Sequence, residues 1–301
     1  MNSAPRIVVA GATGRLGGRI VTALLKRGAA VVALTRVDSA AYTVAALRAQ
    51  GVEVAVVDLA DVDSVAAACR GASCVVSAVL GLHDVMVGAQ QRLVEGAMAA
   101  GVPRFIPSDY CLDFTALNDG DNRNLDLHRE FKRWLDRQPI ASTSIFNGAF
   151  MDMLTGQAPM IMFARRRVLF WRSADQRLDF TTMDDTAAFT AAAALESSTP
   201  RILKITGEAI TARGLATLLT SLTGTPFQAQ WAGTLLTLKA MIAVARLVNP
   251  GKHEPFPAWQ GMQYFHNMFQ GRAVLDPLDN DRYPELTFTP AREVLRAHLQ
   301  A

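Results

Sequence analysis

Three glycines near the start of the chain have a spacing that could hold a nucleotide phosphate. They follow the apolar residues 7–10 in the segment Gly11-Ala12-Thr13-Gly14-Arg15-Leu16-Gly17. A strand, a tight glycine turn and a helix bring backbone N–H groups close to a pyrophosphate, and the helix N-terminus favours its negative charge. The segment therefore predicts a dinucleotide site that is built from Gly11, Thr13, Gly14, Arg15, Leu16 and Gly17.

The ends of the next predicted strands add further cofactor contacts. Arg36 follows residues 31–35, where a carboxylate would bind a ribose 2′-OH and an arginine pairs with a 2′-phosphate. Arg36 therefore favours NADP(H), whereas Asp38, two residues later, argues for NAD(H). Asp58 would lie near the adenine, and Ser77 and Ala78 would run beside the phosphates and ribose.

Apolar strands alternate with amphipathic helices through the first half of the chain. Strands are predicted at residues 7–10, 31–35, 52–57, 74–79, 105–107 and 143–146, and helices at residues 15–27, 40–50, 62–69, 87–100 and 127–136. This rhythm predicts a parallel sheet with helices on both faces and ligands at the carboxyl ends of its strands. The expected fold is α/β, a Rossmann-type doubly wound parallel sheet with a smaller, mixed α/β C-terminal substrate lobe.

The second half is less regular and predicts the substrate lobe. We expect a dinucleotide-binding domain at residues 1–149 and a lobe at 150–301, interleaved with the first. The polar segment 109–126 predicts a loop over the cofactor cleft that closes and excludes water. Apolar side chains at helical spacing fit either a core or a pocket for a bulky substrate. The candidates for substrate contact are Phe150, Met151, Trp171 and Trp259.

Composition excludes several classes of function. A net charge of +3 is too small to indicate a nucleic-acid surface, and three unpaired-looking cysteines offer no metal-ligand spacing. The apolar stretch 232–248 is short for a membrane span and carries Lys239 and Arg246. A short polar N-terminus indicates no signal peptide. These features predict a cytoplasmic protein, a monomer or homodimer, without a metal, a membrane or a nucleic-acid partner.

Several motifs together resemble the NmrA-like, isoflavone reductase-like branch of the atypical short-chain dehydrogenases/reductases. They are GATGRLGG at 11–18, Arg36, FIPSDY at 105–110, STSI at 142–145 and DFTTMDDTA at 179–187. The likeness covers about the first two thirds of the chain. It implies that NADP(H) is held by the glycine turn and Arg36, with the nicotinamide near Ser108 and Asn147.

The resemblance also implies a proton donor on the helix after the fifth strand. The reductases of the family carry a lysine there, and an ungapped count places that position on His128, with Lys132 one turn further along the same face. Histidine titrates near neutral pH, so His128 can donate the proton that accompanies a hydride. Ser108 or Tyr110 can donate a hydrogen bond to a developing oxyanion. Tyr110 lacks a lysine four residues later, so the usual Tyr-x-x-x-Lys pair is absent.

These features predict an NADPH-dependent reductase of a bulky apolar substrate, an aromatic carbonyl or enone above all. The absent lysine keeps an alternative open, a non-enzymatic regulatory protein that senses the redox state of NAD(P)(H). Isomerisation with a tightly held NAD is a third reading, which Arg36 and the absent Tyr-x-x-x-Lys pair disfavour.

Overall fold

A computed structural model describes residues 4–156 and 158–300 of the chain. These residues form two compact units, and each unit draws on three segments of the chain. The first unit contains the described residues up to Tyr110, together with Leu127–Ile145 and Thr186–Leu203. The second contains Cys111–Asp126, Phe146–Asp185 and the described residues from Lys204 onward.

The first unit is built on a six-stranded sheet in the order β3-β2-β1-β4-β5-β6, and all neighbouring strands are parallel. The strands are β1 (Arg6–Ala10), β2 (Ala30–Thr35), β3 (Glu53–Val56), β4 (Cys74–Ser77), β5 (Arg104–Ile106) and β6 (Ala141–Ser142). The strand order turns back on itself at β1 and β4, which confirms the doubly wound sheet. The carboxyl ends of β1, β2, β3, β4 and β5 share one edge, where such sheets bind ligands.

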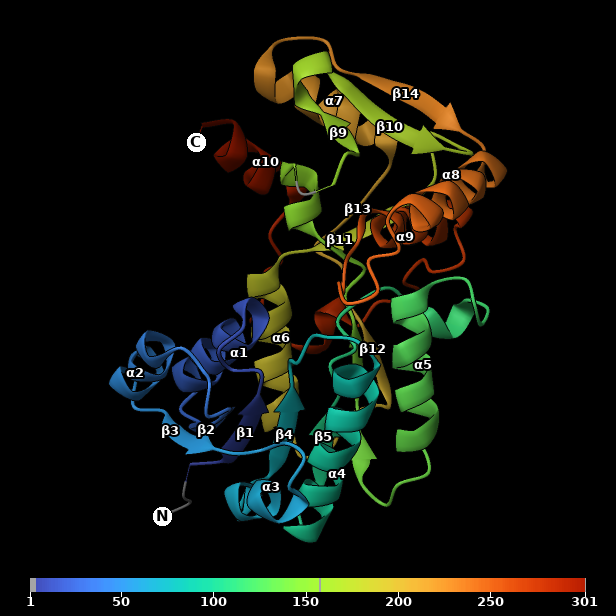
Figure 1. Ribbon diagram of the computed structural model, residues 1–301. Helices are drawn as coiled ribbons and strands as arrows, with labels where there is room; N and C mark the ends of the chain where they lie inside the picture. The colour runs from blue at the N-terminus through green and yellow to red at the C-terminus, as the bar shows by residue number, and fades with distance from the viewer. Residues whose placement is uncertain (1–3, 157, 301) are drawn as a thin grey trace. The chain divides into compact units, whose positions relative to one another are not determined.

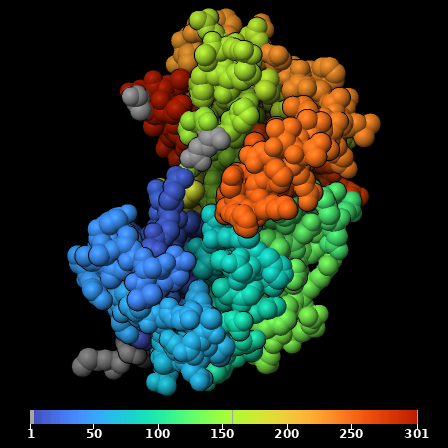
Figure 2. Space-filling view, in the orientation of Figure 1, coloured from blue at the N-terminus to red at the C-terminus, as the bar shows by residue number. Residues whose placement is uncertain are grey.

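Helices cover both faces of this sheet, because alternate side chains of each buried strand point to opposite sides. The face that carries Val8, Val32, Val75 and Phe105 packs against α3, α4 and α5, and α1 and α6 lie on the other face (Figure 1). The outer side chains of α2, α3 and α4 are drawn in blue to cyan in Figure 2. The helices are α1 (Arg15–Lys26), α2 (Ala41–Ala49), α3 (Val62–Cys69), α4 (Gln90–Ala99), α5 (Arg123–Leu135) and α6 (Met183–Leu195).

Two elements of the first unit differ from the sequence prediction. The helix expected at 87–100 begins earlier, as the π-helix η1 (Asp84–Ala89), and continues as α4. The strand expected at 143–146 is β7 (Ser144–Phe146), which does not join the parallel sheet; the sixth strand of that sheet is β6, just before it. Successive backbone N–H groups of a strand point to opposite sides. Thr143 N donates to Phe105 O at 3.0 Å, whereas Ser144 N donates to Arg201 O at 2.9 Å, next to β12 (Ile202–Lys204).

The second unit contains two small mixed sheets and four further helices. One sheet has the order β14-β10-β9 and the other the order β13-β11-β8. Their strands are β8 (Ala149–Phe150), β9 (Ile161–Met162), β10 (Arg167–Trp171), β11 (Leu178–Thr181), β13 (Glu208–Ile210) and β14 (Gln228–Gly233). The helices are α7 (Ala212–Thr223), α8 (Leu235–Val248), α9 (Ala258–Gln270) and α10 (Ala291–Gln300). Within the described chain, no helix combines the length and the apolar character that crossing a membrane requires.

The polar segment before α5 is packed within the second unit. Its short 3-10 helix η2 (Phe114–Ala116) buries Phe114 completely, and Asp113 forms an ion pair with Lys204 at 2.8 Å. The side chain of Asn122 exchanges hydrogen bonds with Gln260 and Asn267 of α9, at 2.6 Å and 3.0 Å. The loop predicted to reach residue 126 ends earlier, because α5 begins at Arg123. Its closure over a cofactor stays a prediction.

Candidate functional site

The glycine turn after β1 accepts only glycine at two of its positions. Gly11 has a φ of +80°, and an added Cβ would collide with the carbonyl oxygen of Ala78. A Cβ on Gly17 would collide with the carbonyl oxygen of Gly11. The turn therefore lies in close backbone contact with both α1 and the loop after β4. A close-fitting backbone of this kind is what a pyrophosphate needs.

The N-terminus of α1 is arranged to receive an anion. Gly14 is the N-cap, and it offers no side-chain oxygen to the N–H groups of the first turn. The first turn carries no acidic residue, and Arg15 and Thr13 are exposed there. Because the N-terminal N–H groups of a helix bind phosphate well, these residues fit the pyrophosphate of a dinucleotide.

Arg36 lies at the carboxyl end of β2, where a ribose would be recognised. Its side chain is exposed, and its Nε lies 3.2 Å from Oδ1 of Asp38. Arg36, which favours NADP(H), and Asp38, which argues for NAD(H), therefore form an ion pair. The pair engages Nε, so a 2′-phosphate could bind the terminal guanidinium nitrogens without separating the two side chains.

The remaining predicted cofactor residues lie at the same edge of the sheet. Ala78 N donates to Ala10 O at 2.8 Å, which places Ala78 against the glycine turn. Ser77 is fully buried, and its hydroxyl has no hydrogen-bond partner in the described part of the chain. Asp58 accepts a hydrogen bond from Ala60 N at 2.8 Å and so stabilises its own turn. The unsatisfied hydroxyl and the glycine cradle both fit a polar ligand at this edge.

Ser108 is held in place by two contacts that the sequence did not reveal. Its hydroxyl donates to Val79 O at 2.8 Å, and its N–H donates to Oε1 of Gln90 at 3.0 Å. Gln90 is buried and its Nε2 donates to Met86 O at 2.7 Å, inside the π-helix η1. The π-helix thus orients Gln90, and Gln90 orients the backbone of Ser108. No local spacing signals this contact in the sequence.

Tyr110 is buried, and it is the last residue of the N-terminal segment of the first unit. Burial raises the pKa of its phenol, so the group stays protonated well above neutral pH. In that state Tyr110 can donate a hydrogen bond and cannot serve as a base.

The strongest chemical feature of the first unit is a buried histidine–carboxylate pair. Nδ1 of His128, on α5, lies 3.0 Å from Oδ1 of Asp109, which follows β5. The Asp109 side chain is fully buried and that of His128 is 10% exposed. An ionised carboxylate at this distance favours the tautomer of His128 that carries a proton on Nδ1. The sequence did not single out Asp109 as a candidate site residue, because its contact with His128 spans 19 positions of the chain.

Lys132, the other candidate for the family lysine, does not contact Asp109. Its Nζ donates to Oδ2 of Asp136 at 2.6 Å, directly after the last residue of α5. Partial burial would raise the pKa of Asp136, but hydrogen bonds from Lys132 and Arg201 lower it below its usual value. Of the two candidates, His128 is therefore the one that pairs with the buried Asp109.

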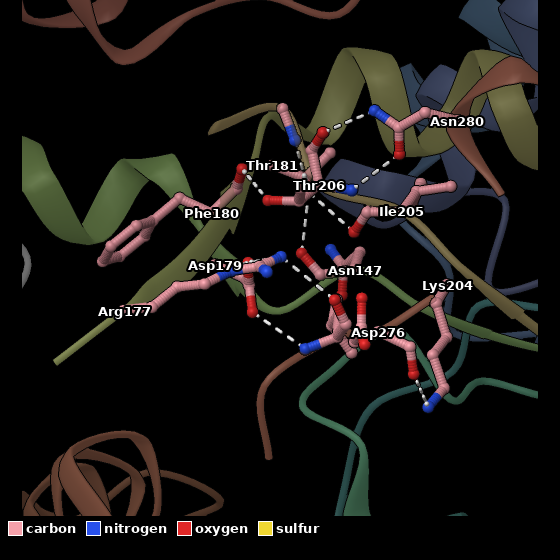
Figure 3. Close-up of polar contacts among 12 residues, drawn as sticks. Asn147, Arg177, Asp179, Phe180, Thr181, Lys204, Ile205, Thr206, Asp276 and Asn280 are labelled. Atoms are coloured by element: carbon pink, nitrogen blue, oxygen red, sulfur yellow. Dashed lines mark hydrogen bonds and ion pairs between the residues drawn. The ribbon is translucent and has the colours of Figure 1, made fainter. Parts of the chain in front are cut away.

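The candidate residues of the second unit are mostly internal. Asn147 is buried; its N–H donates to Cys111 O at 3.1 Å and its backbone oxygen accepts from Thr181 Oγ1 at 2.7 Å (Figure 3). An added Cβ on its neighbour Gly148 would collide with the carbonyl oxygen of Asp179, so the chain passes close to β11 here. Asn147 is firmly positioned, and its contact with a nicotinamide stays a prediction.

Three of the four predicted substrate residues pack into the interior of the second unit. Met151 is fully buried, Trp171 stacks on Phe265 with 5.7 Å between ring centroids, and Trp259 lies beneath the guanidinium of Arg123. This is the core role that the sequence left open. Phe150 is half-buried, and its contact with substrate stays a prediction, as it does for the other three.

The described residues contain no cluster of three or more histidine, cysteine or acidic side chains that could hold a metal ion. Cys69, Cys74 and Cys111 are buried and free. Within the part of the chain that the structure describes, the polar chemistry therefore centres on His128, Asp109 and the strand ends around Gly11.

Comparisons with known proteins identify a family whose model matches this chain and relatives of similar sequence. The model of the NmrA-like family matches residues 3–284. A bifunctional pinoresinol-lariciresinol reductase from Linum usitatissimum is 26% identical over 198 residues, which cover 62% of this chain and 63% of that protein. The match thus spans less than two thirds of the relative's length.

Solved structures share the fold at low sequence identity. AtPrR2 with NADP+ and (+)pinoresinol has a TM-score of 0.84 and 21% identity, and the match covers 99% of this chain and 100% of that one. An isoflavone reductase has a TM-score of 0.81 and 19% identity, with 98% and 99% covered. At these identities the likeness establishes the common architecture.

Proposed function

Because the chain belongs to the NmrA-like family, we propose that it is an NADPH-dependent reductase of bulky apolar substrates, aromatic carbonyls and enones above all. The observation that carries this proposal is the buried Asp109–His128 pair. It supplies a proton donor in the unit that also holds the glycine turn and Arg36. The names of the relatives support the same class of reaction.

The cofactor would be held by residues at the carboxyl edge of the sheet. The N-terminus of α1 and the Gly11 turn would bind the pyrophosphate, and Arg36 would bind the 2′-phosphate of NADPH. Ser77 and Ala78 would lie along the phosphates and ribose. The bound nicotinamide supplies a hydride, and the protein must orient the acceptor and deliver a proton.

His128 would deliver that proton from Nε2. In the imidazolium form, Nδ1–H donates to the Asp109 carboxylate and Nε2–H faces away from it. When Nε2–H is transferred to the alkoxide or enolate oxygen of the reduced substrate, the ring becomes the neutral Nδ1–H tautomer, which Asp109 already stabilises. Solvent water then returns the proton. The carboxylate is fully buried, so its effect on the ring is little screened.

Two measurements test the proposal. Calorimetry should show that NADPH binds more tightly than NADH, as an exposed arginine at the end of β2 predicts. The loss of NADPH absorbance should then reveal turnover with quinones, aromatic ketones or phenylpropanoid-type enones. Absence of turnover across all three classes, with tight NADPH binding, would contradict the reductase.

A redox-sensing regulatory protein is the second candidate, because the ungapped count from the family resemblance places His128 where the reductases have a lysine. A sensor would bind NADP+ and NADPH with different affinities and would capture a partner protein in only one state. A pull-down with each nucleotide form, run beside the turnover assay, separates the two functions. Turnover without a redox-dependent partner supports the reductase.

A further inference from the structure

Asp109 is one link in a longer chain of hydrogen bonds. While its Oδ1 faces His128, its Oδ2 accepts a hydrogen bond from the hydroxyl of Ser144 at 2.6 Å. Nη1 of Arg201 in turn donates to the Ser144 oxygen at 2.7 Å. Asp109, His128, Ser144 and Arg201 all belong to the first unit. The chain therefore runs from a guanidinium to the imidazole through a serine and a carboxylate.

The chemistry of these groups sets the direction of every bond in the chain. Arg201 can only donate, so the Ser144 oxygen must accept from it. Ser144 has one proton, and the position of Asp109 makes the carboxylate oxygen its acceptor. A proton on Asp109 Oδ2 would meet the proton of Ser144, so this oxygen is kept unprotonated. When Asp109 is ionised, its Oδ1 is an acceptor as well, and it selects the Nδ1–H form of His128.

These hydrogen bonds matter energetically because the groups that form them are buried. Asp109 and Ser144 are fully buried, and a buried carboxylate without hydrogen-bond donors is costly. Both carboxylate oxygens of Asp109 have a hydrogen-bonding neighbour in this arrangement. Asp136 orients Arg201 in turn, because Nε of Arg201 donates to Oδ1 of Asp136 at 2.8 Å. Asp136 also binds Lys132, so the two sequence candidates for the family lysine stand at the two ends of one network.

We propose that Arg201 and Ser144 are positioning residues that hold Asp109 as an acceptor and thereby fix which nitrogen of His128 carries the transferable proton. The catalytic consequence rests on the proposed reductase function. The consequence for the tautomer of His128 does not, because it follows from the hydrogen bonds alone. Such support matters for a histidine and not for a lysine, because the imidazole that remains after proton transfer has two tautomers and an amine has none.

The direct test is the Ser144→Ala variant, with Ser142→Ala on the neighbouring strand β6 as its matched control. Loss of a hydrogen bond to a charged group should lower kcat about 10-fold to 100-fold, while KM for NADPH changes less than about twofold. Ser142→Ala should leave both constants unchanged. A merely structural role for Ser144 would lower stability or alter KM without this selective loss of kcat.

Arg201 gives a second set of variants at a partly exposed position. Arg201→Lys retains a group that can only donate and should keep much of the wild-type kcat. Arg201→Gln introduces an amide that can also accept, which removes the fixed direction, and kcat should fall as it does in Ser144→Ala. This comparison remains available if Ser144→Ala does not fold.

Nitrogen NMR of the imidazole provides a readout that does not depend on turnover. The His128 signal, identified by its loss in His128→Gln, should show the proton on Nδ1 in the wild-type protein and a mixture of tautomers in Ser144→Ala. An unchanged tautomer in Ser144→Ala overturns the proposal, and so does an unchanged kcat in an active enzyme. If the wild-type protein shows no turnover, the reductase function fails, and the NMR experiment still decides the positioning role.

Discussion

Nδ1 of His128 lies 3.0 Å from Oδ1 of Asp109, and the pair joins α5 to the end of β5 within the first unit. The carboxylate has no exposed surface, and the ring is 10% exposed. Under the proposed function, the ring would exchange a proton through Nε2 while the buried carboxylate orients it through Nδ1. The proposed proton donation by His128 rests on this orientation.

Replacing Arg36 by alanine should abolish the preference for NADPH. The exposed guanidinium is the group at the end of β2 that can pair with a 2′-phosphate. We expect Kd for NADPH to rise about tenfold or more, with little change for NADH, because a charge-assisted contact to phosphate is lost. Calorimetry measures both constants. Arg48→Ala, an exposed arginine on α2, is the control, and an equal loss in both variants would assign the effect to net charge.

Gly11→Ala should destabilise the protein more than Gly28→Ala. Both glycines have a positive φ, +80° and +77°, so each substitution pays about 1–2 kcal/mol for the left-handed conformation. At Gly11 the new methyl group also meets the Ala78 carbonyl, whereas nothing lies within 4 Å at Gly28. Urea unfolding measures the difference. Equal free energies of unfolding for the two variants would contradict the close backbone contact.

Cys69 and Cys74 should be unreactive in the folded protein. Burial raises the pKa of Cys69 to about 11 and that of Cys74 to about 12, so the reactive thiolate is scarce near neutral pH. A coloured disulfide reagent should label these thiols only after denaturation. Mass spectrometry of the labelled peptides identifies the sites, and rapid labelling of either residue under native conditions would show that the core opens readily.

Asp136 should contribute to stability at neutral pH and lose this contribution in acid. Lys132 and Arg201 lower its pKa in the folded protein from the ordinary value of 3.8. The ionised carboxylate therefore stabilises the fold above the unfolded-state pKa, and the contribution disappears as the pH falls through the lower folded-state pKa. Asp136→Asn should be less stable than wild type near neutral pH, and the two should converge in acid. A constant difference at all pH values would rule out this linkage.

Much of the first unit was predictable because its signals are local. Each strand is a short apolar run and each helix has its own periodicity, so β1, α1, β2 and α3 appear within a few residues of their predicted limits. Asp61 is the N-cap of α3, and its carboxylate accepts hydrogen bonds from Asp63 N and Ser64 N. The glycine turn follows from spacing alone.

The positioning of His128 was not predictable, because the contacts that hold it are distant in sequence. Asp109 and His128 are 19 residues apart, Asp109 and Ser144 are 35 apart, and Ser144 and Arg201 are 57 apart. Only the folded sheet brings these side chains together. The switch of partner between Thr143 and Ser144, which directs Ser144 toward Arg201, leaves no pattern in a run of apolar and hydroxyl residues.

The most direct test of the central claim is the kcat of His128→Gln, compared with His83→Gln. His83 is an exposed histidine that pairs with Glu130 at 3.0 Å, and it has no place in the proposed mechanism. If His128 donates the proton, kcat should fall about 100-fold or more in His128→Gln while Kd for NADPH is unchanged, and His83→Gln should match the wild type. An unchanged kcat in His128→Gln would contradict the account.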